Sequence, residues 1–357
     1  MIGMPKQVSG FYFLHHWQNR RGGVLLGIMG AIQFGDTYES IISVENLLQA
    51  WKEFLCGKRN RPDVLQFERN LMASILRLHR DLAEKAYRHS SYHEFHISDP
   101  KPRIIHKASV RDRLLHHAVY RSLYPFFDRT FITDSYSCRL EKGTHKAMNK
   151  FRTYAYRVSH NHTRTAWVLK CDIKKFFASI DQAILARILR KYIPDADTLW
   201  LLAQIVSSFS STAKGKGLPL GNLTSQLLVN IYMNEFDQFV KHKLKMKQYI
   251  RYADDFVMLS DDRRVLLNML MPIRSFLLER LLLQLHPLKL SISTLASGVD
   301  FLGWVHFPDH RVLRTSARRR MVQNLTVKQG NSAVKESYLG LLRHGNTDRL
   351  VSQVHNM

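Results

Sequence analysis

Three aspartates of this sequence stand where apolar segments end, and carboxylates in such places can hold metal ions. Asp172 follows the apolar segment Trp167–Cys171, and Asp254 and Asp255 lie at the tip of an apolar hairpin pattern, residues 249–260. A buried carboxylate without a cation partner is costly, so acids that strands bring together would form an oxygen-rich pocket suited to Mg²⁺. Two Mg²⁺ ions roughly 4 Å apart can activate an attacking hydroxyl and stabilise a departing pyrophosphate. A pair of aspartates alone is also typical of a solvated turn, and that alternative stays open here.

Apolar periodicity predicts the elements that position these acids. Residues 167–171 predict a buried strand, and two short apolar runs, 249–251 and 256–260, predict a hairpin. Helices are predicted in parts of 39–89, over 110–123, from about 182, and over 199–209, 223–243, 266–285 and the tail 311–357. Further strands are predicted near residues 92–97, 103–106, 290–292 and 301–304. The pattern favours one compact body of helices and sheet with helical ends.

The charge balance indicates a polyanionic partner. Lysine and arginine number 53 against 29 acids in 357 residues, which gives a formal net charge of +24. A surface this basic attracts nucleic acid over a Debye length. An anionic membrane is the alternative, but the sequence shows no amphipathic basic helix or lipidation signal, so we expect no membrane partner. A hydrophobic content of 45% excludes wholesale disorder.

The cysteines and the N-terminal segment favour a reduced cytoplasmic protein. Cys56, Cys138 and Cys171 show no CxxC spacing, which argues against a disulfide framework and a zinc site. The apolar run 22–32 lacks a small-residue cleavage site after it and is too short to span a bilayer. Residues 1–37 are therefore expected to be an N-terminal extension.

Six segments in order resemble the motifs of reverse transcriptases. The sequence Tyr-Ala-Asp-Asp at 252–255 resembles their YxDD box, and Asp172 with an aromatic residue five positions on resembles their first palm motif. The other four are the fingers motif within residues 101–113, the segment 221–226, the lysine motif at 286–289 and the primer-grip motif Phe-Leu-Gly-Trp at 301–304. The resemblance covers about residues 40 to 345.

The resemblance implies an α+β, right-hand polymerase fold with fingers, palm and thumb. It divides the chain into N-terminal helices and fingers at 38–165, a palm at 166–312 and a short basic thumb at 313–357. It implies RNA-templated DNA synthesis from dNTPs on a DNA or RNA primer, with two Mg²⁺ ions for which Mn²⁺ can substitute. The tail is expected to leave no room for an RNase H or endonuclease domain.

The resemblance also implies roles for single residues at the catalytic centre. Asp172 and Asp254 would ligate both metals with help from the Ile173 carbonyl, and Asp255 would complete the shell more weakly. Lys289 would protonate the leaving pyrophosphate, although a surface lysine with no such role is the alternative.

Five further residues are expected to contact the nucleotide. Phe177 would exclude a ribose 2′-hydroxyl, with a core aromatic as the alternative, and Arg103 would clamp the triphosphate, with a template-phosphate or surface role as the alternative. Gly221 would permit close backbone approach, and Gln226 would orient the nucleotide or template. Leu220 replaces the family's usual glutamine and cannot form its hydrogen bond.

Two basic runs are expected to hold the phosphates of an RNA–DNA duplex. One follows the predicted helix 223–243 and contains Lys241, Lys243, Lys245, Lys247 and Arg251. The other opens the tail and contains Arg311, Arg314, Arg318, Arg319 and Arg320. A solvated charged face is the alternative for both runs. The adjacent pairs His15-His16 and His116-His117 are not expected to bind metal, because neighbours on a helix do not face together.

The biological role is inferred from the motif Gly-x-x-x-Ser-Gln at 221–226. It is similar to the hallmark of reverse transcriptases of diversity-generating retroelements, whose aliphatic residue at the position of Leu220 is associated with loose base selection. A structured template RNA and a small accessory protein or noncoding RNA would be the partners. The alternatives are an antiphage-defence reverse transcriptase that copies a noncoding RNA and a group II intron-like maturase.

Overall fold

The apolar runs that flank the predicted acids form the central sheet. The computed structural model describes residues 32–98, 102–327 and 331–356. The sheet contains β3 (Trp167–Asp172), β4 (Tyr249–Tyr252), β5 (Asp255–Ser260) and β6 (Ser291–Thr294), in the order β4-β5-β3-β6 with antiparallel pairing throughout. The strands 167–171 and 249–260 were predicted from the sequence, and the hairpin is confirmed.

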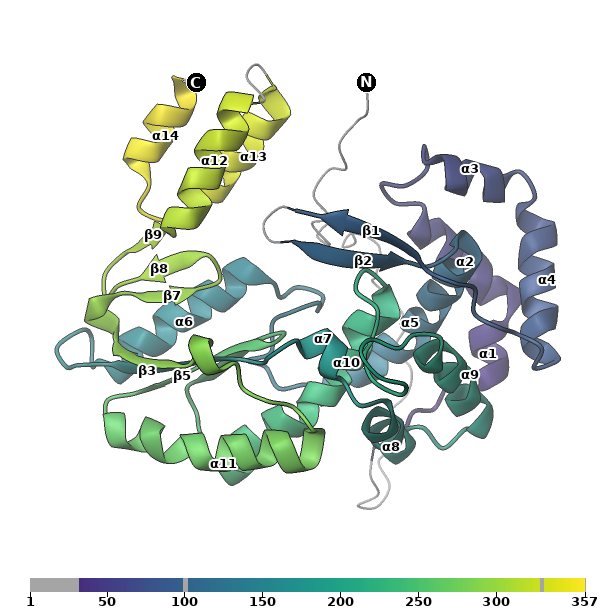
Figure 1. Cartoon of the computed structure of the whole chain (residues 1–357), viewed down its shortest axis with the longest axis horizontal. Helices are drawn as coiled ribbons and strands as arrows, with labels where there is room; N and C mark the ends of the chain where they lie inside the picture. The colour runs from purple at the N-terminus through teal and green to yellow at the C-terminus, as the bar shows by residue number, and fades with distance from the viewer. Residues whose placement is uncertain (1–31, 99–101, 328–330, 357) are drawn as a thin grey trace.

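Both faces of this sheet are covered by helices, which explains why its strands are apolar on both sides. One face packs on α10 (Leu223–Gln238), which continues as a π-helical turn to Lys243, and on α11 (Arg263–Leu281). The other face packs on α6 (Thr144–Val158). Figure 1 shows α11 along the lower side of the sheet and α6 on its opposite side. Helix α6 was not predicted from the sequence, although its apolar residues recur every three or four positions.

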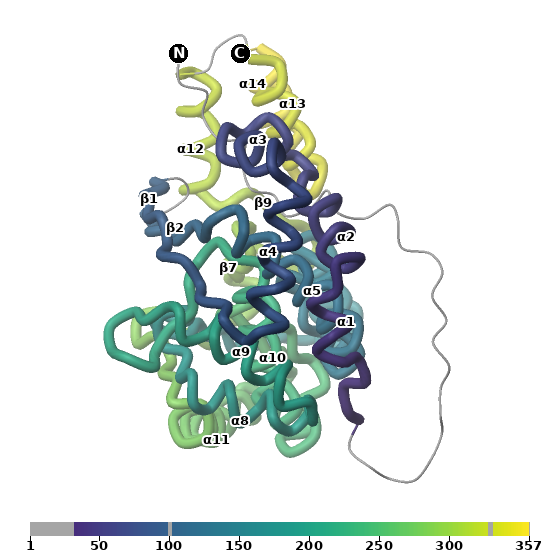
Figure 2. The backbone as a smooth tube through the Cα atoms, turned by 90° about the vertical axis from the view of Figure 1, so that its right-hand side faces the viewer, coloured from purple at the N-terminus to yellow at the C-terminus, as the bar shows by residue number. Residues whose placement is uncertain are grey.

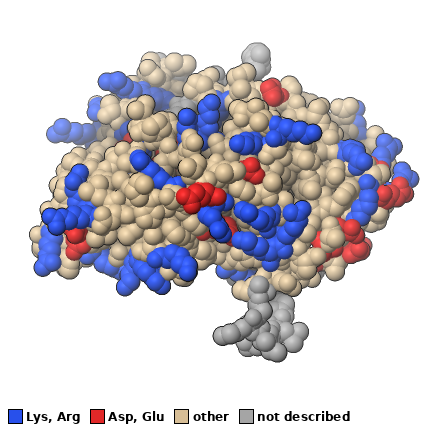
Figure 3. Space-filling view, turned by 60° about the horizontal axis from the view of Figure 1, so that its bottom comes forward, with Lys and Arg blue, Asp and Glu red and all other residues tan. Residues whose placement is uncertain are grey.

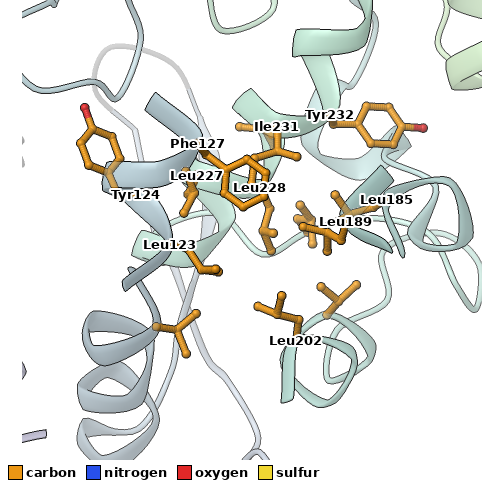
Figure 4. Packing of buried hydrophobic residues seen from close by; sticks show 14 of the residues in the cluster. Leu123, Tyr124, Phe127, Leu185, Leu189, Leu202, Leu227, Leu228, Ile231 and Tyr232 are labelled. Carbon is orange, nitrogen blue, oxygen red and sulfur yellow. The ribbon is translucent and has the colours of Figure 1, made fainter. Parts of the chain in front are cut away.

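A second part of the core joins the palm to the fingers. It contains α5 (Val110–Thr130), α7 (Phe176–Ser179), α8 (Gln182–Tyr192) and α9 (Ala196–Ser207). Helices α5 and α8 pack on α10, and α9 packs on α8. Figure 4 shows leucines of α5, α8, α9 and α10 meeting with Phe127 between them. This packing fixes the start of α10 relative to the strands that carry the acids.

The N-terminal helices lie beyond α5. They are α1 (Tyr38–Ile42), α2 (Val44–Phe54), α3 (Pro62–Glu68) and α4 (Leu71–Ala83), followed by the hairpin of β1 (His93–Ile97) and β2 (Arg103–Lys107). Phe34, inside the expected extension, is buried and its N–H donates to the carbonyl of Tyr192 at 2.8 Å. Residues 1–31 and Lys101 of the fingers motif lie outside the described residues.

A small sheet connects the palm to three C-terminal helices. It contains β7 (Val299–Phe301), β8 (Trp304–His306) and β9 (Arg311–Leu313), and the helices are α12 (Thr315–Val327), α13 (Ser332–Leu342) and α14 (Asp348–His355). The prediction of one strand over 301–304 is wrong, because Leu302 and Gly303 have φ of +53° and +85° and form a tight hairpin turn. In Figure 2 the C-terminal helices lie at one end of the molecule and α8 and α11 at the other.

None of the helices in the described ranges is both long enough and apolar enough to cross a membrane.

Candidate active site

Strand pairing brings two of the predicted acids together across about eighty residues of sequence. β3 and β5 are antiparallel neighbours, and their register places Asp172 directly opposite Asp255. Residues paired in this way share a face of the sheet. The third acid, Asp254, lies in the adjoining turn, and its carbonyl accepts a hydrogen bond from the Ile173 N–H at 3.1 Å. The four residues expected to hold metal therefore occupy one end of the β3–β5 pair.

The turn that carries Asp254 has a specific backbone geometry. β4 ends at Tyr252 and β5 begins at Asp255, so only Ala253 and Asp254 connect them. Ala253 has a left-handed φ of +56°, as tight hairpin turns require. The hydroxyl of Thr144 on α6 donates to the Tyr252 hydroxyl at 3.1 Å, which fixes the strand at the point where the turn begins.

Burial and mutual repulsion disfavour the charged forms of the two hairpin acids. Burial raises the pKa of Asp255 to about 7; Lys170 opposes this shift, and Asp172 and Asp254 increase it. The pKa of Asp254 is also raised, first by burial and then by the charge of Asp172, while Lys289 and Arg103 act in the opposite direction. The protein therefore places more negative charge here than its own cations offset.

Two lysines lie against these carboxylates. The Lys289 ammonium donates to both oxygens of Asp172 at 3.0 Å, and the Lys170 ammonium lies 3.8 Å from Asp255. The acids are thus adjacent, but Asp172 is paired with Lys289 and Asp255 lies near Lys170. Within the described ranges no three histidine, cysteine or acidic side chains converge as a metal site would require.

The donor set nevertheless fits a hard divalent cation. Asp255 Oδ1 is buried and has no hydrogen-bond partner, and an unpartnered buried carboxylate oxygen costs stability. Carboxylate and carbonyl oxygens are the ligands that Mg²⁺ prefers. Asp172, Asp254 and Asp255, with the Ile173 carbonyl, are the residues that could hold such an ion.

Arg251 supports the turn from beneath, and its predicted role in nucleic-acid binding is wrong. Its side chain is fully buried and pairs with Asp237 of α10, whose two oxygens accept its Nε and Nη2 at 2.8 and 2.6 Å. Nη2 also donates to Ser135, and Nη1 donates to Asn230 and to the Ala253 carbonyl at 3.2 Å. Because strand residues alternate between faces, the Arg251 side chain lies on the face that α10 covers and cannot reach a duplex.

Two predicted nucleotide-binding residues lie where the fingers hairpin meets the palm. The His106 N–H of β2 donates to the Leu220 carbonyl at 3.0 Å, and the Asn222 side chain donates to the His106 carbonyl at 2.9 Å. Gly221 has φ of +103°, and a Cβ there would lie 2.7 Å from the Ile105 side chain. Glycine at this position is thus required for the approach of β2 to the palm.

The other three predicted nucleotide-binding residues are Phe177, Arg103 and Gln226. The Phe177 carbonyl accepts from the Leu218 N–H at 2.9 Å, which links it to the segment before Leu220, and its half-buried ring packs on the core. Arg103 is exposed on β2 and acts electrostatically on Asp254. Gln226 is half-buried in the first turn of α10.

The predicted phosphate-binding residues fall into two separate regions. Lys245 and Lys247 are exposed just before β4, one strand length from the Tyr252 end that carries the acids. Arg314, Arg318 and Arg319 are exposed at the start of the C-terminal helices with half-buried Arg320, and Arg314 pairs with Asp300 at 3.1 Å. Figure 3 shows Lys and Arg spread over the lower face of the molecule with few acids among them.

Lys170 and Asp237 were not predicted to belong to the site, although the sequence pattern around each of them indicates a special role. Lys170 interrupts an apolar strand two residues before Asp172, so the period of two places both on one face. Asp237 is an acid within the apolar helix α10, and such a residue needs a buried cation. His116 is buried, its Nε2 lies 3.2 Å from the Nε2 of His89, and burial lowers its pKa to about 3. His15 and His16 lie outside the described residues.

Comparisons with known proteins identify the family of the chain. A sequence profile described as "Reverse transcriptase (RNA-dependent DNA polymerase)" matches residues 97–306, more than half of the chain. Protein YkfC of Escherichia coli K12 is 27% identical over 259 residues, which cover 62% of this chain and 66% of YkfC. The group II intron-encoded protein LtrA of Lactococcus lactis subsp. cremoris is 28% identical over 141 residues, 38% of this chain and 22% of LtrA.

The chain spans just under two thirds of the length of YkfC and about a fifth of LtrA. Among solved structures, a telomerase from Candida albicans in complex with a fragment of telomeric RNA gives a TM-score of 0.46 at 12% identity, over 70% of this chain and 52% of the telomerase chain. The profile match spans the strands, the turn and the segment 220–222 described above. The chain therefore belongs to the reverse transcriptase (RNA-dependent DNA polymerase) family.

Proposed function

We propose that the chain is an RNA-directed DNA polymerase that extends a primer with dNTPs on an RNA template in the cytoplasm. The observation that carries this proposal is the surplus of carboxylates at the end of β3 and β5, where Asp255 keeps a buried oxygen without a partner. Bound there, two Mg²⁺ ions would activate the primer 3′-hydroxyl and stabilise the departing pyrophosphate.

The chain's own residues would position the reactants around those ions. Asp172 and Asp254 would hold both ions, the Ile173 carbonyl would assist, and Asp255 would act from the neighbouring strand. Lys289 is half-exposed, so its ammonium can move from Asp172 to the leaving pyrophosphate and donate a proton there. The ring of Phe177 would exclude a 2′-hydroxyl, and Arg103 on β2 would bind the triphosphate.

The biological role that we favour is a diversity-generating retroelement. The motif at 221–226 and the aliphatic Leu220 support it, because leucine offers no hydrogen bond to the incoming nucleotide. One such restraint contributes roughly 1 kcal/mol. Its loss lowers discrimination by about fivefold. An intron-associated role is the second candidate, because LtrA and other intron-encoded proteins are among the relatives of this chain.

Primer extension tests the activity. The protein is incubated with a primed RNA template, dNTPs and Mg²⁺, with a DNA template of the same sequence and an EDTA reaction as controls. We expect cDNA on the RNA template that EDTA abolishes, and no cDNA under any divalent-ion condition would refute the proposal. Sequencing of the cDNA then separates the two roles: errors concentrated opposite template adenine support the retroelement, and uniformly accurate cDNA supports the intron-associated enzyme.

A further inference from the structure

A basic pocket lies at the junction of the palm and the C-terminal helices, apart from the carboxylates. It is a cavity of about 230 Å³ between α6, the turn that joins β8 to β9, and the segment that joins α13 to α14. In Figure 1, β9 lies beside the lower ends of the C-terminal helices. Of the residues that line this pocket, only Arg311 has a role predicted from the sequence, in the basic run expected to bind a duplex.

The lining of the pocket is strongly cationic. Three arginines line it: Arg152 of α6, Arg311 of β9 and Arg343 after α13. The β8–β9 turn contributes residues 307–310, among them His310. The acid that lines it is Asp309, whose carboxylate is largely exposed and lies 2.7 Å from the His310 ring. Three arginines thus line a pocket whose one lining acid already has a partner.

The guanidinium of Arg311 is held by two of its nitrogens, and its third nitrogen has no hydrogen-bond partner. Its Nε donates to the His344 carbonyl, and its Nη2 donates to the Asn149 side chain at 3.2 Å. Its Nη1 is buried and has no hydrogen-bond partner. Burial and the nearby charge of Arg152 lower the pKa of Arg311, which is the electrostatic sign of a pocket without enough negative charge.

We propose that this pocket binds a phosphate group. Arginine forks match the oxygens of phosphate, and a buried unpartnered donor offers a hydrogen bond that only an anion or water can accept. The volume suits a phosphate with its waters and is below the range of pockets for whole drug-sized ligands. Two sources share this chemistry: a backbone phosphate of bound nucleic acid, and free phosphate or pyrophosphate.

A bound phosphate would act on the C-terminal helices. It would join β9, which leads directly into α12, to the segment between α13 and α14, and both to α6. The pocket would thereby fix the orientation of these helices over the palm. This inference goes beyond the polymerase function and does not depend on it.

The test uses the full chain with two exposed arginines of the pocket replaced, Arg152→Gln with Arg343→Gln. The matched control is Arg157→Gln with Arg349→Gln, which removes the same charge from exposed positions of α6 and α14 outside the pocket lining. Equal melting temperatures of both variants and the wild type in chloride establish that the fold is retained. Because phosphate stabilises proteins in general, each comparison is made against the control variant.

The first arm measures melting in phosphate and in chloride of equal ionic strength. We expect phosphate to raise the melting temperature of the control by about 2 °C more than that of the pocket variant. The second arm measures binding of an RNA–DNA duplex against salt concentration by fluorescence anisotropy. If a backbone phosphate occupies the pocket, the salt slope of the pocket variant falls by about 1 to 2 relative to the control.

The two arms identify the source and can overturn the proposal. A lost phosphate effect with an unchanged salt slope identifies free phosphate, and a lowered salt slope identifies a nucleic-acid phosphate. A pocket variant that behaves like the control in both arms shows that the pocket binds no phosphate.

Discussion

Strand β5 is flanked by two aspartate pairs of identical composition, and they behave in opposite ways. Asp254-Asp255 lies at the start of the strand, which begins at Asp255, and Asp261-Asp262 follows its end at Ser260. The first pair is half-buried beside Asp172, and one of its oxygens lacks a partner. The second pair is exposed, and Asp262 accepts the Arg264 N–H at 2.8 Å and caps the start of α11.

The comparison teaches that residue type alone does not identify a catalytic carboxylate. An exposed acid at the start of a helix accepts hydrogen bonds from backbone N–H groups of the first turn and stabilises local structure. An acid that strands force against another acid carries unfavourable energy that only a cation or a proton can relieve. The second situation marks a functional site, because a fold under selection for stability alone would have no reason to keep it.

The largest expected effect separates the two pairs by activity. Asp254→Asn with Asp255→Asn should lower dNTP incorporation at least about a thousandfold, since metal centres of this kind contribute several kcal/mol. Asp261→Asn with Asp262→Asn should stay within about twofold of the wild type. Primer-extension rates measure both, and RNA affinity should be unchanged because it is spread over many Lys and Arg contacts. Residual activity above a thousandth in the first variant would contradict the metal assignment.

The second prediction concerns the buried ion pair beneath the turn. Arg251→Met should lower the free energy of unfolding by about 3 to 5 kcal/mol, because it leaves Asp237 buried and charged. Lys289→Met, which breaks the partly exposed pair with Asp172, should cost less than about 1 kcal/mol. Urea denaturation measures both values. Equal losses in the two variants would show that the Arg251 pair does not support the turn in the way described.

The third prediction concerns pH. A carboxyl whose pKa is higher in the folded than in the unfolded chain binds its proton more tightly when folded. The pKa of Asp255 is about 7 in the folded protein and 3.8 ordinarily. The metal-free protein should therefore lose stability as pH rises from about 4 to about 7. The loss relative to Asp255→Asn should be at most about 4 kcal/mol. Denaturation in EDTA across this range measures it, and parallel curves for the two proteins would exclude it.

The smallest expected effect tests the exposed pair. Asp262→Ala should cost about 1 kcal/mol through loss of the helix cap, and Asp262→Asn should cost little because asparagine caps as well. Thermal denaturation of both variants measures the difference. Equal stability of the two would mean that the cap does not contribute and would weaken the contrast with Asp254-Asp255.

Much of the site could be predicted because its signals are local. Apolar runs gave β3 and the β4–β5 hairpin, and the acids at their ends followed from the same pattern. The partners of Arg251 could not be predicted, because a basic residue near other basic residues has the same local signature whether it is exposed or buried. Leu302 and Gly303 form a turn within an apolar run, which only their left-handed backbone distinguishes from a strand. The ion pair of Lys289 with Asp172 could not be predicted either, because tertiary packing brings together two residues that are 117 positions apart in the sequence.

Binding of Mn²⁺ to the protein, followed by electron paramagnetic resonance, tests whether Asp254 and Asp255 hold a divalent cation. The free-ion signal is titrated with wild type, with Asp254→Asn plus Asp255→Asn, and with Asp261→Asn plus Asp262→Asn as the matched control. We expect the wild type and the control to bind Mn²⁺ equally and the Asp254/Asp255 variant to bind at least about tenfold more weakly, a difference of about 1.4 kcal/mol. Equal binding by all three proteins would contradict the claim that the buried acids of the β4–β5 turn hold a divalent cation.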